Sequence, residues 1–211
     1  MVRIAVLVSG GGTNLQALID AQSRGELKNG RIAAVLSSRP DAYALERAAR
    51  AGIPGYVVAR KDLASNREMT VALVDKLREL NIGLVVLAGF LHILTGEMVA
   101  AFPNAILNVH PALIPSFAGP GCYGLHVHEK ALEYGVKLSG ATVHFVSEEC
   151  DGGPIVLQKA VEVLPDDTPE VLQRRIMEQC ELKLLPQAVS LFCQGRLKVE
   201  GRLVRVLDRP E

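Results

Sequence analysis

Short apolar runs alternate with longer amphipathic stretches through the first half of the chain. Runs rich in Val, Ile, Leu and Ala are typical of buried parallel strands, and they occupy residues 4–8, 32–36, 56–58, 83–88 and 105–109. Between them, apolar residues recur with helical spacing, as at Leu15, Leu18 and Ile19, within residues 41–50, and at Leu73, Leu77 and Leu80. The alternation predicts an α/β fold, a doubly wound, mostly parallel sheet with flanking helices.

The second half is patterned differently and carries more Pro and Gly. The expected elements are a loop at residues 111–125, a short helix at 128–134, and strands at 138–146 and 155–163 joined by a tight turn at 151–154. Thr168 as a cap and Pro169 as the first helical residue predict a last helix that runs to about Gly195. The tail, residues 203–211, is expected to form a short strand or to be partly disordered.

Composition narrows the class of protein. The 211 residues carry 23 basic and 23 acidic side chains, and this zero formal charge argues against a nucleic-acid partner. The longest apolar stretch, residues 82–90, is too short to span a bilayer, and the N-terminal apolar run is one strand long rather than a signal peptide. The four cysteines lack zinc-binding spacing. We therefore expect a cytoplasmic protein that uses no metal and binds neither a membrane nor nucleic acid. Its expected partners are small-molecule substrates, and its expected state is a monomer or homodimer.

A glycine-rich turn, Ser-Gly-Gly-Gly-Thr-Asn at residues 9–14, follows the first predicted strand and leads into a helix. Backbone N–H groups and the helix dipole make such a turn an anion site. The dinucleotide fingerprint fails because Leu15 stands where its last glycine belongs, and the P-loop lysine is absent. A phosphate monoester held by the loop, Thr13 and Asn14 is one interpretation; a tight turn with Thr13 or Asn14 as helix cap is the other.

Asn108 and His110 end the run at residues 105–109. Residues two apart on a strand point to the same face, so both side chains are expected in the crevice at the carboxyl end of the sheet. An amide donor beside an imidazole suits oxyanion stabilisation and proton transfer. Asp151 opens a turn with two glycines and a proline. If the fold brings Asp151 to His110, its charge would raise the pKa of the imidazole and favour imidazolium.

Four further side chains have an ordinary structural interpretation on pattern alone. His126 and His128 form His-x-His without other metal ligands nearby, which favours a helix entry. His144 lies inside a predicted strand and suits a core or pocket position. Glu181 lies on an apolar helix face, where an acid is either an edge residue or a ligand contact, and the edge is favoured.

Four segments together resemble the phosphoribosylglycinamide formyltransferases, the folate-dependent family of purine synthesis. The resemblance covers essentially the whole chain in order. Its segments are Ser-Gly-Gly-Gly-Thr-Asn-Leu-Gln at 9–16, Leu-Ala-Gly-Phe at 87–90, Leu-Asn-Val-His-Pro-Ala-Leu-Ile-Pro at 107–115, and Thr-Val-His-Phe at 142–145 with Asp-Gly-Gly-Pro at 151–154. It implies one formyltransferase domain, 1–211, with a Rossmann-like phosphate-binding half at 1–110 and a folate-binding and catalytic half at 111–211.

The resemblance also implies roles for single residues. Asn108, His110 and Asp151 match the catalytic triad; Gly12, Thr13 and Asn14 match the phosphate loop and Glu181 a ribonucleotide contact. Folate positions are matched by Arg67, Leu91, His92, Ile93, Leu94 and again Asn108, and His144 matches a pocket histidine. The implied reaction is attack of the glycinamide ribonucleotide amine on the formyl carbon of 10-formyltetrahydrofolate. Asn108 and a protonated His110 would stabilise the tetrahedral oxyanion, and no metal is required.

The chain departs from the family pattern in two places. Residues 117–125 are longer and richer in Gly than the usual segment, which predicts a mobile lid or a looser connection. His92 stands where Arg is often found, so folate affinity is expected to differ. The resemblance also makes Ile114–Pro115 a candidate cis peptide.

Two alternative functions remain at this stage. Formyltetrahydrofolate deformylase shares the core but has an N-terminal regulatory domain, which is not expected because the first predicted strand begins near Val2. A non-catalytic nucleotide-binding module would keep the glycine loop without needing Asn108, His110 and Asp151 together.

Overall fold

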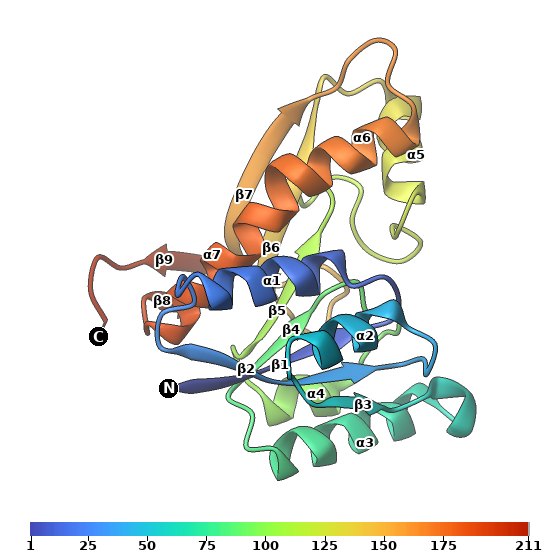
Figure 1. Cartoon of the computed structure of the whole chain (residues 1–211). Coiled ribbons are helices and arrows are strands. Elements are labelled where there is room, and N and C mark those ends of the chain that lie inside the picture. The colour runs from blue at the N-terminus through green and yellow to red at the C-terminus, as the bar shows by residue number, and fades with distance from the viewer. Residues whose placement is uncertain (211) are drawn as a thin grey trace.

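Seven strands form one sheet in the computed structural model, which describes residues 1–210 (Figure 1). Their order is β3 (Gly55–Val57), β2 (Gly30–Ser37), β1 (Val2–Val8), β4 (Leu84–Leu87), β5 (Ile106–His110), β6 (Leu138–Phe145) and β7 (Ile155–Glu162). The first five are parallel, whereas β6 runs antiparallel to β5, and β7 to β6. The expected doubly wound, mostly parallel sheet is confirmed.

Helices cover both faces of the sheet. One face packs against α1 (Thr13–Ser23), α2 (Tyr43–Arg50), α5 (His126–Tyr134), α6 (Pro169–Ile176) and α7 (Leu182–Cys193). The other face packs against α3 (Asn66–Glu79) and α4 (Gly96–Ala101), which lie together at the bottom of Figure 1. β1 shows why two layers form: Ile4 and Val6 enter the first core, and Ala5 and Leu7 enter the second. Burial on both faces explains its uninterrupted apolar run.

Several boundaries differ from the sequence-based expectation. The short helix α4 was not predicted, and the connection between β6 and β7 is the nine-residue segment 146–154 rather than a tight turn at 151–154. The expected last helix is continuous in outline but contains a π-helical segment, Met177–Glu181, between α6 and α7. Before the tail, the strand β8 (Leu197–Glu200) was not predicted, and it forms a hairpin with β9 (Leu203–Val206). The strand alternative therefore holds for the first part of the tail, while residue 211 lies outside the described residues.

Candidate active site

The carboxyl ends of β1, β4 and β5 meet at one edge of the sheet. The glycine loop follows β1, residues 88–94 follow β4, and Asn108 and His110 lie at the end of β5. The chain order reverses between β1 and β4, and such a switch point is where ligands bind in sheets of this kind. Leu87 pairs with Asn108, which brings the segment after β4 beside the catalytic candidates. These residues therefore lie at the edge of the sheet where the sequence placed them.

Asn108, His110, His144 and Asp151 converge on one another. Asp151 Oδ2 lies 3.6 Å from His110 Nδ1, and Asp151 Oδ1 lies 3.6 Å from His144 Nε2. The Asn108 amide donates to Asp151 Oδ1 over 3.4 Å and approaches His144 Nε2 at 3.2 Å. Both amide contacts are near the long limit for a hydrogen bond, so the amide is oriented and can still turn toward a substrate oxygen. His144 is thus part of the cluster.

The backbone around Asp151 explains how a residue 41 positions from His110 reaches it. Asp151 has φ 55°, in the left-handed region that Asp tolerates better than most residues. Beyond it, an added Cβ at Gly153 would lie 1.8 Å from the Phe145 carbonyl oxygen, so only glycine permits this approach to the end of β6. The Pro154 carbonyl oxygen accepts from the Phe145 N–H at 2.9 Å. The turn is thereby fastened to β6, and Asp151 faces β5.

Burial dominates the proton affinity of His110. Burial lowers its pKa below the ordinary 6.5, and the Asp151 charge and the Phe117 carbonyl oxygen raise it only in part. His110 is only 4% exposed, and this burial favours the neutral ring over the resting imidazolium that the resemblance implied. Burial also acts to raise the pKa of Asp151, but contacts with His144, His110 and the Gly119 N–H outweigh it and leave that pKa below its ordinary value.

The first residues of the extended loop take part in the site, which the sequence did not indicate. His110 Nε2 lies 2.8 Å from the Phe117 carbonyl oxygen, and the Gly119 N–H donates to Asp151 Oδ2 at 3.0 Å. Phe117 and Gly119 have φ 52° and 85°, and this left-handed backbone turns their peptide groups toward His110 and Asp151. This end of the loop is anchored rather than a loose connection. The Ile114–Pro115 peptide is cis, as the resemblance suggested.

The glycine loop has its carbonyl groups turned away from the crevice. The carbonyl oxygens of Gly10, Gly11 and Gly12 accept from Ala44 N, Arg47 Nε and Gln16 N at 3.1, 2.8 and 2.9 Å. In a trans peptide the N–H points opposite to the C=O, so the N–H groups of residues 11–13 face away from those partners. Added Cβ atoms at Gly10 and Gly11 would meet nothing within 4 Å, so open space lies beside the loop.

Both the backbone conformation at position 12 and the close packing of α2 require glycine there. It caps α1 with φ 73°, and an added Cβ would lie 2.7 Å from Ala44 Cβ. The exposed Thr13 and the buried Asn14 follow as the first residues of α1. The loop has the position and the donor orientation that an anion site at a helix N-terminus requires, and anion binding itself stays a prediction.

Glu181 reaches the glycine loop from the other end of the chain. Its Oε2 accepts from Asn14 Nδ2 at 2.8 Å, and the side chain is buried. Burial raises the pKa of Glu181, and the Asn14 amide offsets part of that effect. Asn14 Oδ1 is also buried and has no hydrogen-bond partner among the described residues. An edge position for Glu181 is therefore wrong, and the free acceptor beside it suits a ligand donor.

The candidate folate residues lie on α3 and on the segment after β4. Leu91 and Ile93 are 63% and 61% exposed, which is unusual for large apolar side chains. Burial first, and then the charge of Arg60, lower the pKa of His92. The exposed Arg67 donates to Glu97 Oε1 at 2.6 Å, and Thr95 N donates to Thr70 Oγ1 at 3.1 Å. These two bonds join α3 to Thr95 and to α4, which directly follow that segment.

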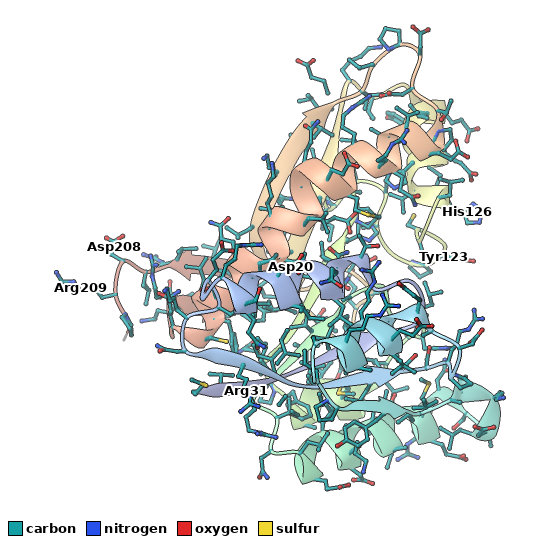
Figure 2. All side chains as sticks on the ribbon, viewed as in Figure 1. Asp20, Arg31, Tyr123, His126, Asp208 and Arg209 are labelled. Carbon is teal, nitrogen blue, oxygen red and sulfur yellow. The ribbon has the colours of Figure 1, made fainter. Side chains whose placement is uncertain are left out.

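The two histidines of His126-x-His128 have different surroundings. α5 begins at His126, which confirms a helix entry. His126 is exposed, pairs with Glu129 and contacts the Tyr123 ring, and Figure 2 shows Tyr123 and His126 near each other at the edge of the molecule. His128 is fully buried, and neither ring nitrogen has a hydrogen-bond partner within residues 1–210. Burial, followed by the charge of His110, lowers the pKa of His128 to about 4.

Residues 1–210 contain no group of three or more His, Cys, Asp or Glu side chains placed to hold a metal ion. None of the helices in that range combines the length and the apolar content that crossing a membrane demands.

Comparisons with known proteins agree with the geometry. The sequence profile described as formyl transferase matches residues 2–189. Phosphoribosylglycinamide formyltransferase of Haemophilus influenzae is 44% identical over 96% of this chain and 92% of its own. The structure of glycinamide ribonucleotide transformylase 1 from Symbiobacterium toebii superimposes with a TM-score of 0.93 at 48% identity, covering 99% of this chain and 95% of that one.

A formyltetrahydrofolate deformylase from Pseudomonas syringae has the same core. Its structure superimposes with a TM-score of 0.86 at 26% identity, over 98% of this chain and 66% of that one. The resemblance found in the sequence to phosphoribosylglycinamide formyltransferases is confirmed by the higher identity and mutual coverage of the relatives of that name. The profile match over most of the chain shows that it belongs to the formyl transferase family.

Proposed function

We propose that this protein transfers the formyl group of 10-formyltetrahydrofolate to the amine of glycinamide ribonucleotide in purine biosynthesis. The observation that carries the proposal is the convergence of Asn108, His110 and Asp151 at the sheet edge that also holds the glycine loop. The names of the relatives and the family membership support it. A nucleotide-binding module would need the loop but would not need an amide, an imidazole and a carboxylate gathered beside it.

The ribonucleotide is assigned to the glycine loop and Glu181. The N–H groups of Gly12 and Thr13 would receive the phosphate at the N-terminus of α1, where the helix dipole favours an anion. Asn14 Oδ1, buried without a partner, would accept from a substrate hydroxyl or amide N–H. Glu181 holds the Asn14 side chain in the orientation that leaves this acceptor facing the ligand.

The folate is assigned to the exposed segment after β4 and to Arg67. Leu91 and Ile93 offer apolar surface to a flat ring system, while His92 and Leu94 complete the segment. Arg67 would pair with a folate carboxylate, for which Glu97 is the resident competitor. Asn108 would contact the formyl group between the two substrates. These folate positions lie within residues 1–110, whereas Glu181 and Asp151 come from the second half of the chain. The proposed site therefore draws on both halves, and folate binding is not confined to the second.

The chemistry is direct transfer. The amine nitrogen attacks the formyl carbon, and the carbonyl oxygen becomes an oxyanion to which the Asn108 amide donates. The bond from the formyl carbon to the folate nitrogen then breaks. The amine loses one proton and the departing folate nitrogen gains one, so the reaction needs no net proton and no redox partner.

His110 is suited to receive the amine proton because burial keeps its pKa low and its ring neutral at pH 7. A neutral ring that donates from Nε2 to the Phe117 carbonyl oxygen carries its lone pair on Nδ1. Protonation of Nδ1 forms an ion pair with Asp151 Oδ2, 3.6 Å away. Asp151 therefore stabilises an imidazolium that forms during the reaction. We place the reaction in the cytoplasm and expect a monomer or homodimer.

A formyl-transfer assay with purified protein tests the proposal. Release of tetrahydrofolate that requires both 10-formyltetrahydrofolate and glycinamide ribonucleotide is the expected result. A parallel reaction with formate and ATP in place of the folate should give no product. Release of free formate without the ribonucleotide would instead make the protein a deformylase. Tight binding of both substrates without turnover would support the nucleotide-binding module.

A further inference from the structure

On the side of the glycine loop that faces α2, this helix supplies a cation, Arg47. Arg47 Nε donates to the Gly11 carbonyl oxygen at 2.8 Å, and Arg47 Nη1 donates to Gln16 Oε1 at 3.0 Å. The guanidinium also stacks on the Tyr43 ring, with 5.0 Å from Cζ to the ring centroid. Arg47 thus touches the loop, the first turn of α1 and its own helix, and it has no part in the proposed chemistry.

We propose that Arg47 is a positioning residue that sets the phosphate loop for the ribonucleotide by fixing the Gly11–Gly12 peptide. The inference rests on the proposed function, because it assigns the phosphate to this loop. The Gly11 carbonyl is held toward α2, so the Gly12 N–H in the same trans peptide points into the crevice. A rotation of this peptide would present a carbonyl oxygen to the phosphate instead of a donor.

Glycine residues allow such a rotation at little cost, so the orientation of the Gly11–Gly12 peptide has to be fixed by a contact from outside the loop. The space beside Gly10 and Gly11 is open, so no side chain restricts the loop there. The neighbouring peptide is held in the same sense, since Ala44 N donates to the Gly10 carbonyl oxygen at 3.1 Å. α2 therefore holds two successive carbonyls of the loop, one through its backbone and one through Arg47.

The geometry of the guanidinium fits this role better than an ammonium would. Two donors at a fixed angle reach Gly11 and Gln16 together, and Gln16 is itself anchored by donation to Asp20 Oδ1 at 2.8 Å. The Arg47 Cδ lies 3.4 Å from the position that a Gly12 Cβ would take, so the stem packs against the loop as well. The positive charge behind the loop also favours a bound anion.

Arg50 provides a matched control on the same helix. Its guanidinium also stacks on the Tyr43 ring, with 5.5 Å from Cζ to the ring centroid, and it donates to Tyr43 Oη and to Glu46. Its described contacts stay within α2. Arg50→Met therefore removes one positive charge from α2 but removes no contact with the glycine loop. We expect Arg50→Met to keep wild-type kinetics.

The test compares Arg47→Met, Arg47→Lys and Arg50→Met with two acceptors, glycinamide ribonucleotide and the same compound without its phosphate. Arg47→Met should raise KM for the ribonucleotide about tenfold, the scale of one charge-assisted hydrogen bond, with kcat within about twofold. KM for the folate, and kcat/KM for the dephosphorylated acceptor, should stay within about twofold. Arg47→Lys should fall between, because it keeps the charge and loses the two-point contact.

Each outcome has a distinct meaning. An unchanged ribonucleotide KM in Arg47→Met, or an equal loss with the dephosphorylated acceptor, would overturn the role of Arg47. A parallel loss in Arg50→Met would show a general charge effect and would also overturn it. If the wild-type enzyme itself does not prefer the phosphorylated acceptor, the assignment of phosphate to the loop fails, and this result is independent of any variant.

Discussion

Removal of the charge of Asp151 is the most demanding test of the site, because its carboxylate lies close to two histidines, His110 and His144. Asp151→Asn has nearly the same shape but removes the charge between His110 Nδ1 and His144 Nε2, each 3.6 Å from a carboxylate oxygen. The Gly119 N–H can still donate to an amide oxygen in place of Asp151 Oδ2. The substitution therefore tests charge more than packing.

The magnitude follows from that separation. Two unit charges 3.6 Å apart interact with about 4.6 kcal/mol at an effective dielectric constant of about 20. This is an upper limit for what Asp151 gives the imidazolium, and it corresponds to about three powers of ten in rate. We expect Asp151→Asn to lower kcat by about 10²- to 10³-fold, while the dissociation constants of both substrates change by less than about threefold.

Single-turnover rates measured between pH 5.5 and 9 provide the assay. Asp151 raises the pKa of His110 against the larger effect of burial, so its removal moves that pKa still lower. Any limb of the wild-type profile that reports His110 should shift to lower pH in Asp151→Asn. Glu149→Gln, on the same segment and exposed, removes one charge without a His110 contact and should keep the wild-type rate. A kcat for Asp151→Asn within threefold of wild type would refute the reasoning.

Three further changes test other parts of the site. Asn108→Ala should lower turnover by about 10²- to 10³-fold through loss of the oxyanion donor, and near-wild-type turnover would remove that role. Glu181→Gln should raise KM for the ribonucleotide about tenfold with little change for the folate, because Asn14 loses a charged acceptor; a selective folate effect would contradict this. His128→Leu should remove a pH dependence: the folded pKa of about 4 lies below 6.5, so the unfolded chain binds the extra proton and wild-type stability falls by about 3 kcal/mol from pH 6.5 to 4. Urea unfolding of both proteins at these pH values checks it, and equal losses would contradict it.

The elements that position the site were largely predictable because their signals are local. β1, β4 and β5 are apolar runs buried on both faces, and Asn108 and His110 interrupt such a run at its carboxyl end. Their common orientation follows from strand geometry alone. The approach of Asp151 does not, because it depends on a left-handed residue and on the contact of Gly153 with β6. Only the resemblance to a known family indicated that pairing before the structure.

Arg47 was missed for a different reason. On a helix that buries Ala44 and Ala48, an arginine between them is expected at the surface, and its pattern is that of an ordinary amphipathic helix. The contact with Gly11 arises because Gly12 lets α2 approach within 2.7 Å of where a side chain would begin. The sequence feature that could have indicated this contact is therefore the run of three glycines and not the arginine. Gly10 and Gly11 leave the space beside the loop open, and Gly12 permits the close approach of α2.

Glu181 shows how an irregular helix turns an apparent edge residue into a buried one. In a regular helix each residue advances by about 100°, so Cys180 and Glu181 would not share a direction. The π-helical segment Met177–Glu181 adds a residue to the turn, and both side chains are buried, Cys180 in the core and Glu181 against Asn14. Pro186 gives the physical reason for irregularity nearby, since it lacks an N–H for the Leu182 carbonyl oxygen and crowds it. A proline inside a predicted helix, five residues beyond an acid on its apolar face, is therefore a sequence feature that indicates an irregular turn and a buried position for that acid.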